Sequence, residues 1–264
     1  HVNFLNFAAP QTIHAGIEND LDIHQTATEK GQLGGTIAVH GNLLTRFELF
    51  DLTLGFNTTA QIDTTSMLRL YPDIHFNLPL AHNMYNIYLG MTGYLEDNCY
   101  KSMTNVNPFT IETQNPFFTN YKMIYTFGIN GNPSKRFSFN TAFNHSRVEN
   151  GLFFINHFDS TKLANGTNLF TAIYDHVDIL KLNAVFYYKL NEKLRVLLRG
   201  TYYNYTMTNE EKPWHQQPYD LNLGIDYNMQ NKFLFKTEVS YLGGSYAKIY
   251  NTTLNKYEAT LMKD

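Results

Sequence analysis

The chain has 264 residues, of which only 16% are charged and 15% are aromatic, with 19 Tyr and 20 Phe against one Trp. The formal net charge is −3, so the chain lacks the excess of basic residues that binding to nucleic acid requires, and no nucleic-acid partner is expected. The single cysteine, Cys99, excludes an internal disulfide, and no Cys/His spacing typical of a metal site occurs, so no cofactor is expected. No run of about 18 apolar residues is available for a transmembrane helix.

Alternation of apolar and polar residues recurs along the chain and predicts β-strands, whereas helical periodicity is almost absent. Leu221 and Leu223, for example, alternate with Asn222 and Gly224, and the pattern resumes after a turn at residues 229–231. The predicted strands cover, in chain order, residues 36–43, 50–56, 68–78, 85–95, 137–143, 182–190, 194–202, 219–228 and 233–241.

Short and long connections alternate between these strands, as in an up-and-down meander. Asn, Gly and Pro favour chain reversal, and they predict short turns near Leu44-Thr45, Ala81-His82-Asn83, Asn132-Pro133-Ser134, Asn191-Glu192 and Met229-Gln230-Asn231. Longer polar stretches cover residues 57–66, 96–118, 146–168 and 206–218. At the strand-plus-connection length of an antiparallel barrel, the chain has room for about 12 strands. No linker divides it, so residues 1–264 are expected to form a single β-barrel domain or a fragment of one.

Two architectures place apolar and polar residues on opposite faces of an antiparallel sheet: a soluble sandwich and a transmembrane barrel. The barrel is favoured because the polar face is rich in Asn, Ser, Thr and Gly, and because tyrosines cluster at strand ends as in an interfacial girdle. Several strands also exceed the length of about 5–6 residues that is usual for soluble sheets. In hydrocarbon every backbone N–H and C=O must be paired, so such a sheet has to close on itself. We therefore predict an all-β fold, an antiparallel up-and-down transmembrane β-barrel in a bacterial outer membrane, with lipid against its apolar face.

A tyrosine-rich strand end, a loop and a strand-turn-strand follow one another in residues 198–244, "LRGTYYNYTMTNEEKPWHQQPYDLNLGIDYNMQNKFLFKTEVSYLGG". Together with "YPDIHFNLPL" (71–80), "YLGMTGYLEDNCY" (88–100) and "NPF" (107–109), this run resembles the late barrel strands of large outer-membrane proteins from Bacteroidota-type bacteria, which are grouped with TonB-dependent receptor-like barrels. The resemblance implies a receptor or transporter that takes up a small solute. It also implies a TonB-type energy-coupling protein or a surface lipoprotein as partner.

The sequence departs from that family in three ways. No plug domain and no TonB box precede the strands, and no terminal strand ends in Phe or Trp. About 12 strands are also only about half of the 22 in such barrels. Because the chain begins "HVNFLNFAAP" and ends "YEATLMKD", both ends look cut, and we expect the C-terminal portion of a barrel within a longer polypeptide.

Charged side chains on the polar faces of the predicted strands are the candidates for lining the lumen. They would contact the solute, form lateral ion pairs or anchor a plug, and a structural cross-strand role is an equally good interpretation of each. These candidates are Arg69, Asp73, Arg195, Arg199, Asp226, Lys236 and Glu238. Trp214 and His215 lie in the loop "KPWHQQP" (212–218) and are candidates for ligand contact, with loop packing as the favoured alternative.

Catalytic signatures do not occur in the sequence, which contains no G-x-S-x-G, H-E-x-x-H or P-loop motif. His145 and Ser146 are neighbours on one strand, so their side chains point to opposite faces and cannot pair. His157, Asp159 and Ser160 are interpreted as polar loop residues. We therefore expect that the chain is not an enzyme.

Two segments place carboxylates and histidines at i, i+2 spacing on one strand face: "ENDLDIH" (18–24) and "DHVD" (175–178). Such a cluster would suit a metal at the extracellular rim of a barrel. Ordinary solvated charge is the favoured interpretation, so no metal site is predicted.

Two functions are compatible with the sequence: solute uptake, and the role of a non-transporting barrel subunit of an outer-membrane assembly or secretion complex. The sequence N-terminal to the strands would discriminate between them, since a plug with a TonB box supports uptake. A third, a soluble β-sandwich that binds a partner, would be indicated by extraction into buffer without detergent.

Overall fold

The computed structural model describes residues 10–24, 32–62, 66–111, 118–158, 169–229 and 232–262. Within these ranges the elements are, in chain order, β1 (Gln11–His24), β2 (Gln32–Arg46), β3 (Asp51–Ile62), β4 (Met67–Leu80), β5 (Tyr85–Glu96), α1 (Tyr100–Val106), β6 (Thr119–Ser134), β7 (Phe137–Asn156), β8 (Phe170–Lys189), β9 (Leu194–Met207), β10 (Tyr219–Met229), β11 (Phe233–Leu242), β12 (Ser245–Asn251) and β13 (Lys256–Met262). Across this described part of the chain, no helix is both long and apolar enough to cross a membrane.

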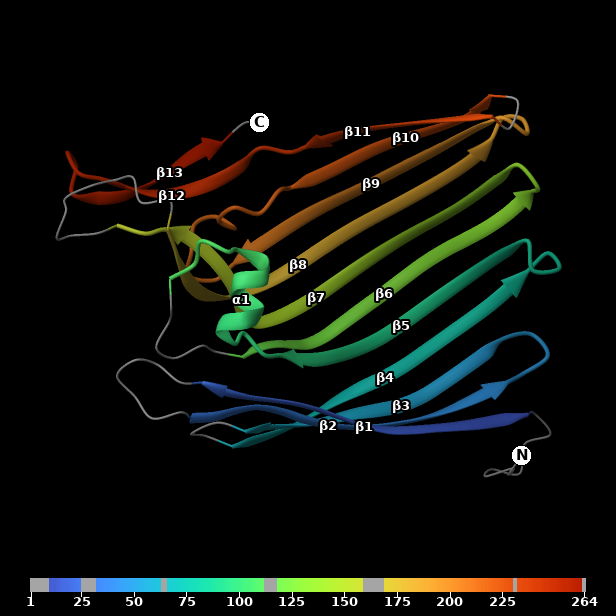
Figure 1. The fold of residues 1–264 in the computed structure, drawn as a ribbon. Coiled ribbons are helices and arrows are strands. Elements are labelled where there is room, and N and C mark those ends of the chain that lie inside the picture. The colour runs from blue at the N-terminus through green and yellow to red at the C-terminus, as the bar shows by residue number, and fades with distance from the viewer. Residues whose placement is uncertain are drawn as a thin grey trace.

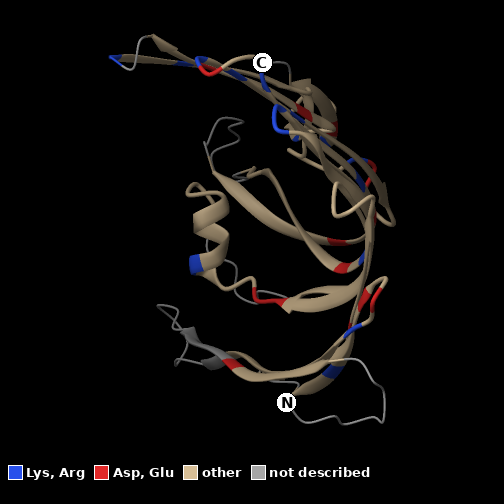
Figure 2. Cartoon of the chain, turned by 90° about the vertical axis from the view of Figure 1, so that its right-hand side faces the viewer, with Lys and Arg blue, Asp and Glu red and all other residues tan. Residues whose placement is uncertain are grey.

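Eleven of the strands form one antiparallel sheet in which each strand pairs with its neighbours in sequence, in the order β1 to β11. The sheet curves into a trough whose two edges, β1 and β11, do not meet (Figures 1 and 2). β12 and β13 form a separate two-stranded sheet. The predicted all-β, up-and-down antiparallel fold is confirmed, and the strands within the described residues number eleven plus two, close to the expected 12.

The two ends of the trough carry different connections. At one end β2, β4, β6 and β8 each turn tightly into the following strand. The opposite end, which we call the rim, carries α1, the connection at residues 208–218 and the β12–β13 hairpin (Figure 1). α1 lies on the concave side of the sheet, together with the rim ends of β7 and β8 (Figure 2).

Several predicted strand boundaries are wrong, most of all the end of β7, which lies at Asn156 rather than at residue 143. β2 continues through the predicted turn at Leu44-Thr45, and the chain reverses at residues 47–50 instead. β3 and β7 continue into the stretches 57–66 and 146–168, which were predicted as connections. The physical reason is that pairing with β2 and β8 satisfies the backbone groups of these stretches whatever the polarity of their side chains. β1, β6, β12 and β13 lie outside the predicted strand ranges.

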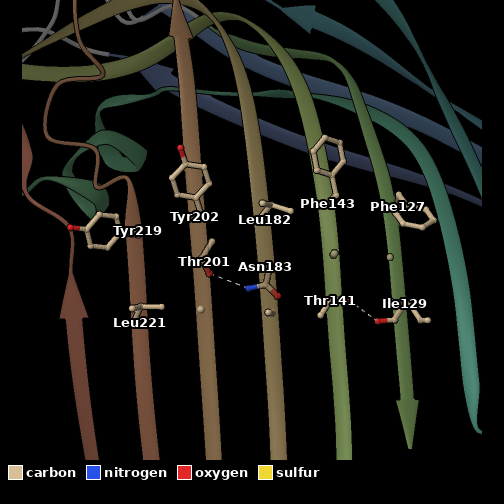
Figure 3. A pocket seen from close by; sticks show the side chains of 14 residues that line it. Phe127, Ile129, Thr141, Phe143, Leu182, Asn183, Thr201, Tyr202, Tyr219 and Leu221 are labelled. Atoms are coloured by element: carbon tan, nitrogen blue, oxygen red, sulfur yellow. Dashed lines mark hydrogen bonds between the residues drawn. The ribbon is translucent and has the colours of Figure 1, made fainter.

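The convex face of the sheet is a continuous apolar band. One row of directly opposed residues crosses the strands from β3 to β10 and consists of Leu52, Phe76, Leu89, Phe127, Phe143, Leu182, Tyr202 and Tyr219. In Figure 3 the last five of these project from one side of the sheet, and α1 lies behind it. Phe127 is 51% exposed and Leu182 47%, since no second layer among the described residues covers them. The soluble sandwich, which needs such a layer, is therefore not what this sheet forms.

The concave face is polar, and its side chains bond to one another between strands that are neighbours or are separated by one strand. The hydrogen bonds include those from Asn42 to Asp73 (3.0 Å), Tyr88 to Asn140 (2.8 Å), Thr126 to Asn144 (2.8 Å) and Asn183 to Thr201 (3.0 Å). Gly128 leaves room for one of them, because a Cβ there would lie 2.2 Å from the Tyr88 ring. The two faces thus differ in chemistry along the whole sheet.

Candidate functional site: the concave face and the rim

A row of charged side chains crosses four strands on the concave face, next to the short turns. Lys189 on β8, Arg195 on β9, Asp226 on β10 and Lys236 on β11 lie directly opposite one another in the register. Directly opposed residues in an antiparallel sheet have Cβ atoms about 4.5–5.5 Å apart. Asp226 therefore lies between two cations, and the row as a whole keeps an excess of positive charge.

Arg199 lies two positions further from the turns on the same face, opposite Val185 and Asn222 rather than opposite a carboxylate. The Asn222 amide is already engaged, since it donates to Glu238 Oε1 at 2.6 Å and to Ser240 Oγ at 2.9 Å. Neither strand beside β9 therefore presents a carboxylate directly opposite the Arg199 guanidinium. Arginine in such a position is suited to planar oxygen ligands such as carboxylates or phosphates.

A hollow of about 370 Å³ brings these side chains together on β8 to β11. It is lined by Tyr187, Arg195, Val196, Leu197, Arg199, Asn222, Gly224, Asp226, Lys236, Thr237 and Glu238. Five of the seven lumen candidates are among these residues. The structure places them on one polar face, and whether they touch a solute remains a prediction.

The other two candidates, Arg69 and Asp73, lie on the concave side of β4, with β5 to β7 between them and the hollow. Arg69 Nη1 donates to Gln61 Oε1 at 2.5 Å. Asp73 accepts from the Asn42 amide at 3.0 Å and lies 2.9 Å from His75 Nε2. These contacts are local cross-strand interactions, so the candidates form two groups rather than one site.

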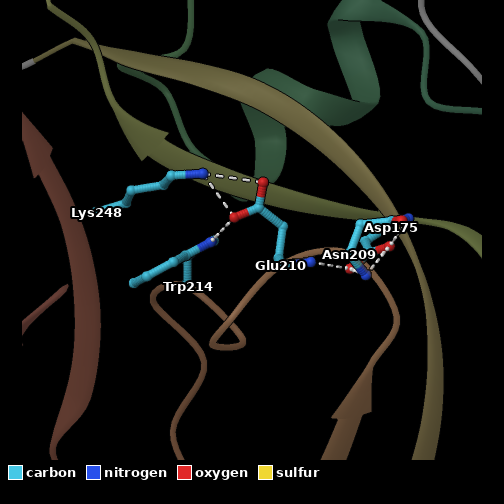
Figure 4. A network of polar contacts seen from close by, with 5 residues as sticks. All are labelled: Asp175, Asn209, Glu210, Trp214 and Lys248. Atoms are coloured by element: carbon cyan, nitrogen blue, oxygen red, sulfur yellow. Dashed lines mark hydrogen bonds and ion pairs between the residues drawn. The ribbon is translucent and has the colours of Figure 1, made fainter. Parts of the chain in front are cut away.

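Asp175 organises the rim (Figure 4). It is only 3% exposed, and its carboxylate accepts hydrogen bonds from the Glu210 N–H (2.8 Å), the Asn209 N–H (3.0 Å), the Asn209 amide (2.7 Å) and the His176 N–H (2.8 Å). Burial by itself would raise the pKa of Asp175, but these hydrogen bonds outweigh it and hold the pKa below its ordinary value. The expected solvated charge in the segment 175–178 is thus wrong for Asp175, which fastens the connection 208–218 to β8.

Glu210 continues the network toward the β12–β13 hairpin (Figure 4). Trp214 Nε1 donates to Glu210 Oε2 at 2.7 Å, and Lys248 Nζ lies 2.9 and 2.6 Å from the two carboxylate oxygens. The Lys248 ammonium also lies 5.5 Å from the centre of the Trp214 ring, within cation–π range. Trp214 is only 3% exposed, so its ring packs inside the rim, and contact with a ligand would require the rim to open.

His215 is likewise held by packing. Its N–H donates to the Tyr246 carbonyl at 2.8 Å, its Nε2 lies 3.2 Å from Asn156 Oδ1, and its ring meets Phe170 edge-on at 5.3 Å. Burial lowers the pKa of His215, which favours the neutral imidazole. The connection 208–218 therefore joins β7, β8 and β12 through Asn156, Asp175 and Tyr246.

No group of three or more His, Cys, Asp or Glu residues suited to a metal ion exists among the residues that the structure describes. The side chains of residues 19–24, and Asp159 and Ser160, lie outside the described residues. His157, the described member of its loop group, has its Nδ1 3.0 Å from Thr171 Oγ1.

Sequence reasoning missed Lys189 in the charged row and the partnership of Glu210 with Lys248. Lys189 could have been found, because the tight turn at residues 190–193 places it opposite Arg195. Glu210 and Lys248 are 38 residues apart on different elements, and no spacing rule connects them.

Solved outer-membrane proteins share this fold. The FrpB iron transporter from Neisseria meningitidis matches with a TM-score of 0.60 and 11% identity, over 88% of this chain and 37% of that one. The pyoverdine outer membrane receptor FpvA from Pseudomonas aeruginosa matches with a TM-score of 0.60 and 15% identity, over 90% of this chain and 35% of that one. The copper transporter OprC matches with a TM-score of 0.59 and 12% identity, over 89% and 41%.

At these identities the likeness concerns the fold, which is similar to the barrels of TonB-dependent receptors. The chain spans between 35% and 41% of the length of these three proteins. No family model matches the chain, and neither does any curated protein.

Proposed function

We propose that the chain forms part of the wall of an outer-membrane β-barrel of the TonB-dependent type, which takes up a small solute. One observation carries the proposal. A sheet of eleven strands has an unbroken apolar convex face and a polar concave face, and these are the two surfaces that a membrane barrel turns to lipid and to its lumen. The outer-membrane proteins that share the fold support the location.

In this proposal further strands extend β1 and β11 until the wall closes. The β1 and β11 edges each leave a row of backbone N–H and C=O groups without a strand partner among the described residues. Hydrocarbon does not tolerate such an edge, because it offers no hydrogen bonds to replace the missing ones. The solved proteins with this fold are longer than this chain, whose match covers 37% and 35% of their lengths.

The solute would pass along the concave face, where the hollow on β8 to β11 presents Arg195 and Arg199. Alternatively, the same residues would hold a plug segment inside the barrel. Such a plug would couple the barrel wall to a TonB-type protein and would therefore also serve uptake. The similar structures are an iron transporter, a copper transporter and a pyoverdine receptor. For this protein we propose only that the solute is a small molecule or a metal complex. A surface lipoprotein is a further proposed partner.

The membrane location is tested with a matched pair of neighbouring residues on β10, Asn222 on the concave face and Leu223 on the convex face. Each is changed to Cys in a Cys99→Ser background, in the natural polypeptide embedded in its membrane. We expect a water-soluble maleimide to label Asn222→Cys and to spare Leu223→Cys until detergent is added. Equal labelling of both in the intact membrane contradicts the location, since it would mean that both faces meet water.

Uptake is tested in cells that lack the gene, with a panel of labelled metal complexes and small nutrients. We expect one solute to accumulate less, and its uptake to depend on TonB. Arg199→Gln should reduce uptake, whereas Arg69→Gln, a matched change outside the hollow, should not. If no solute is affected while other outer-membrane proteins fail to assemble or to be secreted, the non-transporting subunit is correct instead.

A further inference from the structure

A second hollow, of about 500 Å³, lies within the apolar band on the convex face (Figure 3). Its floor is a row of small residues that lie side by side on three strands: Thr141 on β7, Ala184 on β8 and Gly200 on β9. Ile129 and Leu221 continue the row at its two ends. The neighbouring row on the rim side, which runs from Phe127 to Tyr219, consists of bulky side chains and borders the hollow.

The shape of this hollow is built into the sheet. Backbone pairing fixes the positions of the floor residues, and Gly200 keeps the floor low, since a Cβ there would lie 3.1 Å from Leu221 Cδ2. The volume lies within the range of about 300–1,000 Å³ that ligand pockets usually have. An apolar hollow that stays empty forfeits the van der Waals contacts of its lining, so a stable surface of this shape favours an occupant.

A smaller hollow of about 400 Å³ adjoins it toward β4. The two share Phe127 and Phe143, which are directly opposed on β6 and β7 and stand as a ridge between them. The convex face of the central strands is therefore grooved, whereas a uniform row of leucines would be smooth.

We propose that the larger hollow binds an acyl chain of a membrane lipid, from the leaflet on the rim side. This inference rests on the membrane location proposed above. Tyr202 and Tyr219 stand directly opposed at the rim edge of the hollow, and Tyr219 stacks on Tyr241 with ring centroids 5.7 Å apart. Tyrosines gather at the level of lipid headgroups. A lipid anchored at this level has its chain beside the small-residue floor.

The chemistry of the lining favours an acyl chain over a protein segment. The floor backbone is already paired within the sheet, so it offers no hydrogen bonds to the peptide groups of an incoming segment. Inside a bilayer the hydrophobic effect does not favour binding to an apolar surface, because the lipid chains are equally apolar. Binding to the hollow therefore depends on van der Waals packing. A flexible hydrocarbon chain meets that requirement, because it carries no polar group that would be left unpaired.

The test uses the natural polypeptide, extracted in detergent and reconstituted into vesicles of phosphatidylethanolamine and phosphatidylglycerol. The probe is a phosphatidylethanolamine with a diazirine in one acyl chain, and the cross-linked residues are located by mass spectrometry after illumination. We expect adducts to concentrate on the lining of the hollow, at residues 182–184, 200–202 and 219–221, relative to the convex face of β2 and β3. Ala184→Phe fills the hollow and should lower these adducts about threefold, because single packing contacts within a bilayer are weak.

Ala15→Phe is the matched control, since Ala15 is an exposed alanine in the same apolar band on β1, opposite Gly41. It should leave the adducts on β8 to β10 unchanged. Heat-modifiable gel mobility checks that each variant folds, and Thr141→Leu replaces Ala184→Phe if that variant does not. Adducts spread evenly over the convex face, or unaltered when the hollow is filled, overturn the acyl-chain site alone. Adducts on no part of that face overturn both the site and the membrane location.

Discussion

The rim and the wall of the trough are held together in different ways. At the rim, apolar side chains are buried against other protein: Met103 of α1 is fully buried against Phe154 and Ala172, and Val148, Phe153 and Val177 form a second buried cluster. Along the wall, the largest apolar side chains are about half exposed, and the backbone of each strand pairs only with its neighbours in the sheet.

This difference shows where each part obtains its stability. The rim carries its own core and buried polar contacts, as a water-soluble domain does. The wall has backbone pairing but no core, so its apolar face has to be covered by something outside the chain. We expect mutations in the rim to change stability through packing against other protein. Mutations in the wall should change stability through contact with the surrounding lipid or water.

The largest expected effect tests the rim core. Met103→Ala should destabilise the closed rim by about 2–5 kcal/mol, because it removes a fully buried side chain and leaves a cavity. Hydrogen exchange of the β7–β8 hairpin should accelerate, while exchange of β9 and β10 next to the short turns should not change. Leu198→Ala on the convex face is the control, and it should cost less because lipid chains can fill the space. Equal costs for the two would remove the distinction between rim and wall.

A charge introduced on each face of the wall in turn tests which face meets lipid and which meets water. Leu197 and Leu198 are neighbours on β9 that face the concave and the convex side. Leu198→Arg should cost about 2–4 kcal/mol in lipid vesicles, which is the penalty for a cation at the midplane of a barrel's lipid face. Leu197→Arg should cost far less, since its face is expected to be wet. Urea unfolding of the reconstituted variants measures both, and a concave-face penalty as large as the convex one would contradict the assignment of the faces.

Acid should open the rim and leave the wall intact. The folded pKa of Asp175 is below its unfolded value, so the carboxylate stabilises the closed rim at pH values above the ordinary Asp pKa of about 3.9. That contribution is lost as the pH falls further, through the folded pKa. The only tryptophan, Trp214, lies within this network, so its fluorescence reports the opening.

Asp175→Asn should loosen the rim already at neutral pH, at a cost of about 1–3 kcal/mol for the hydrogen bonds that the carboxylate accepts. It should also abolish the acid step in the fluorescence titration. Asp226→Asn, a carboxylate on the wall, should leave the step in place. If the acid step persists in Asp175→Asn, another group controls the rim.

Much of the wall could be predicted from the sequence. Successive side chains of a strand point to opposite faces of the sheet, so the alternation of apolar and polar residues assigns each residue to a face. Arg195, Arg199, Asp226, Lys236 and Glu238 all lie on the face that the alternation assigns to them. Short turns also fix the register of the hairpins that they close. The faces and the pairing of β8 to β11 follow from these two local rules.

The rim could not be predicted in the same way, since its contacts join residues that are far apart in sequence. Trp214 and Lys248 are brought together by Glu210, and β12 carries no alternation that is distinct from the wall strands. Strand ends were also missed there, because the rim parts of β3 and β7 do not alternate: residues 57–61 of β3 are mostly polar, and residues 152–155 of β7 are consecutive apolar residues. A polar strand above the lipid has the same composition as a loop, and only its backbone partner distinguishes the two.

The smallest expected effect compares two tyrosine hydroxyls on the concave face. Tyr71, near the rim end of β4, is 3% exposed and donates to Asn120 Oδ1 at 2.7 Å. Tyr88, further along the wall on β5, makes a similar bond of 2.8 Å to Asn140, but in an exposed position. Tyr71→Phe should cost about 0.5–1.5 kcal/mol, whereas water can replace the bond lost in Tyr88→Phe and the cost should be close to zero. Urea unfolding with Trp214 fluorescence and with circular dichroism separates rim from wall, and equal costs would show that the concave wall is as dry as the rim.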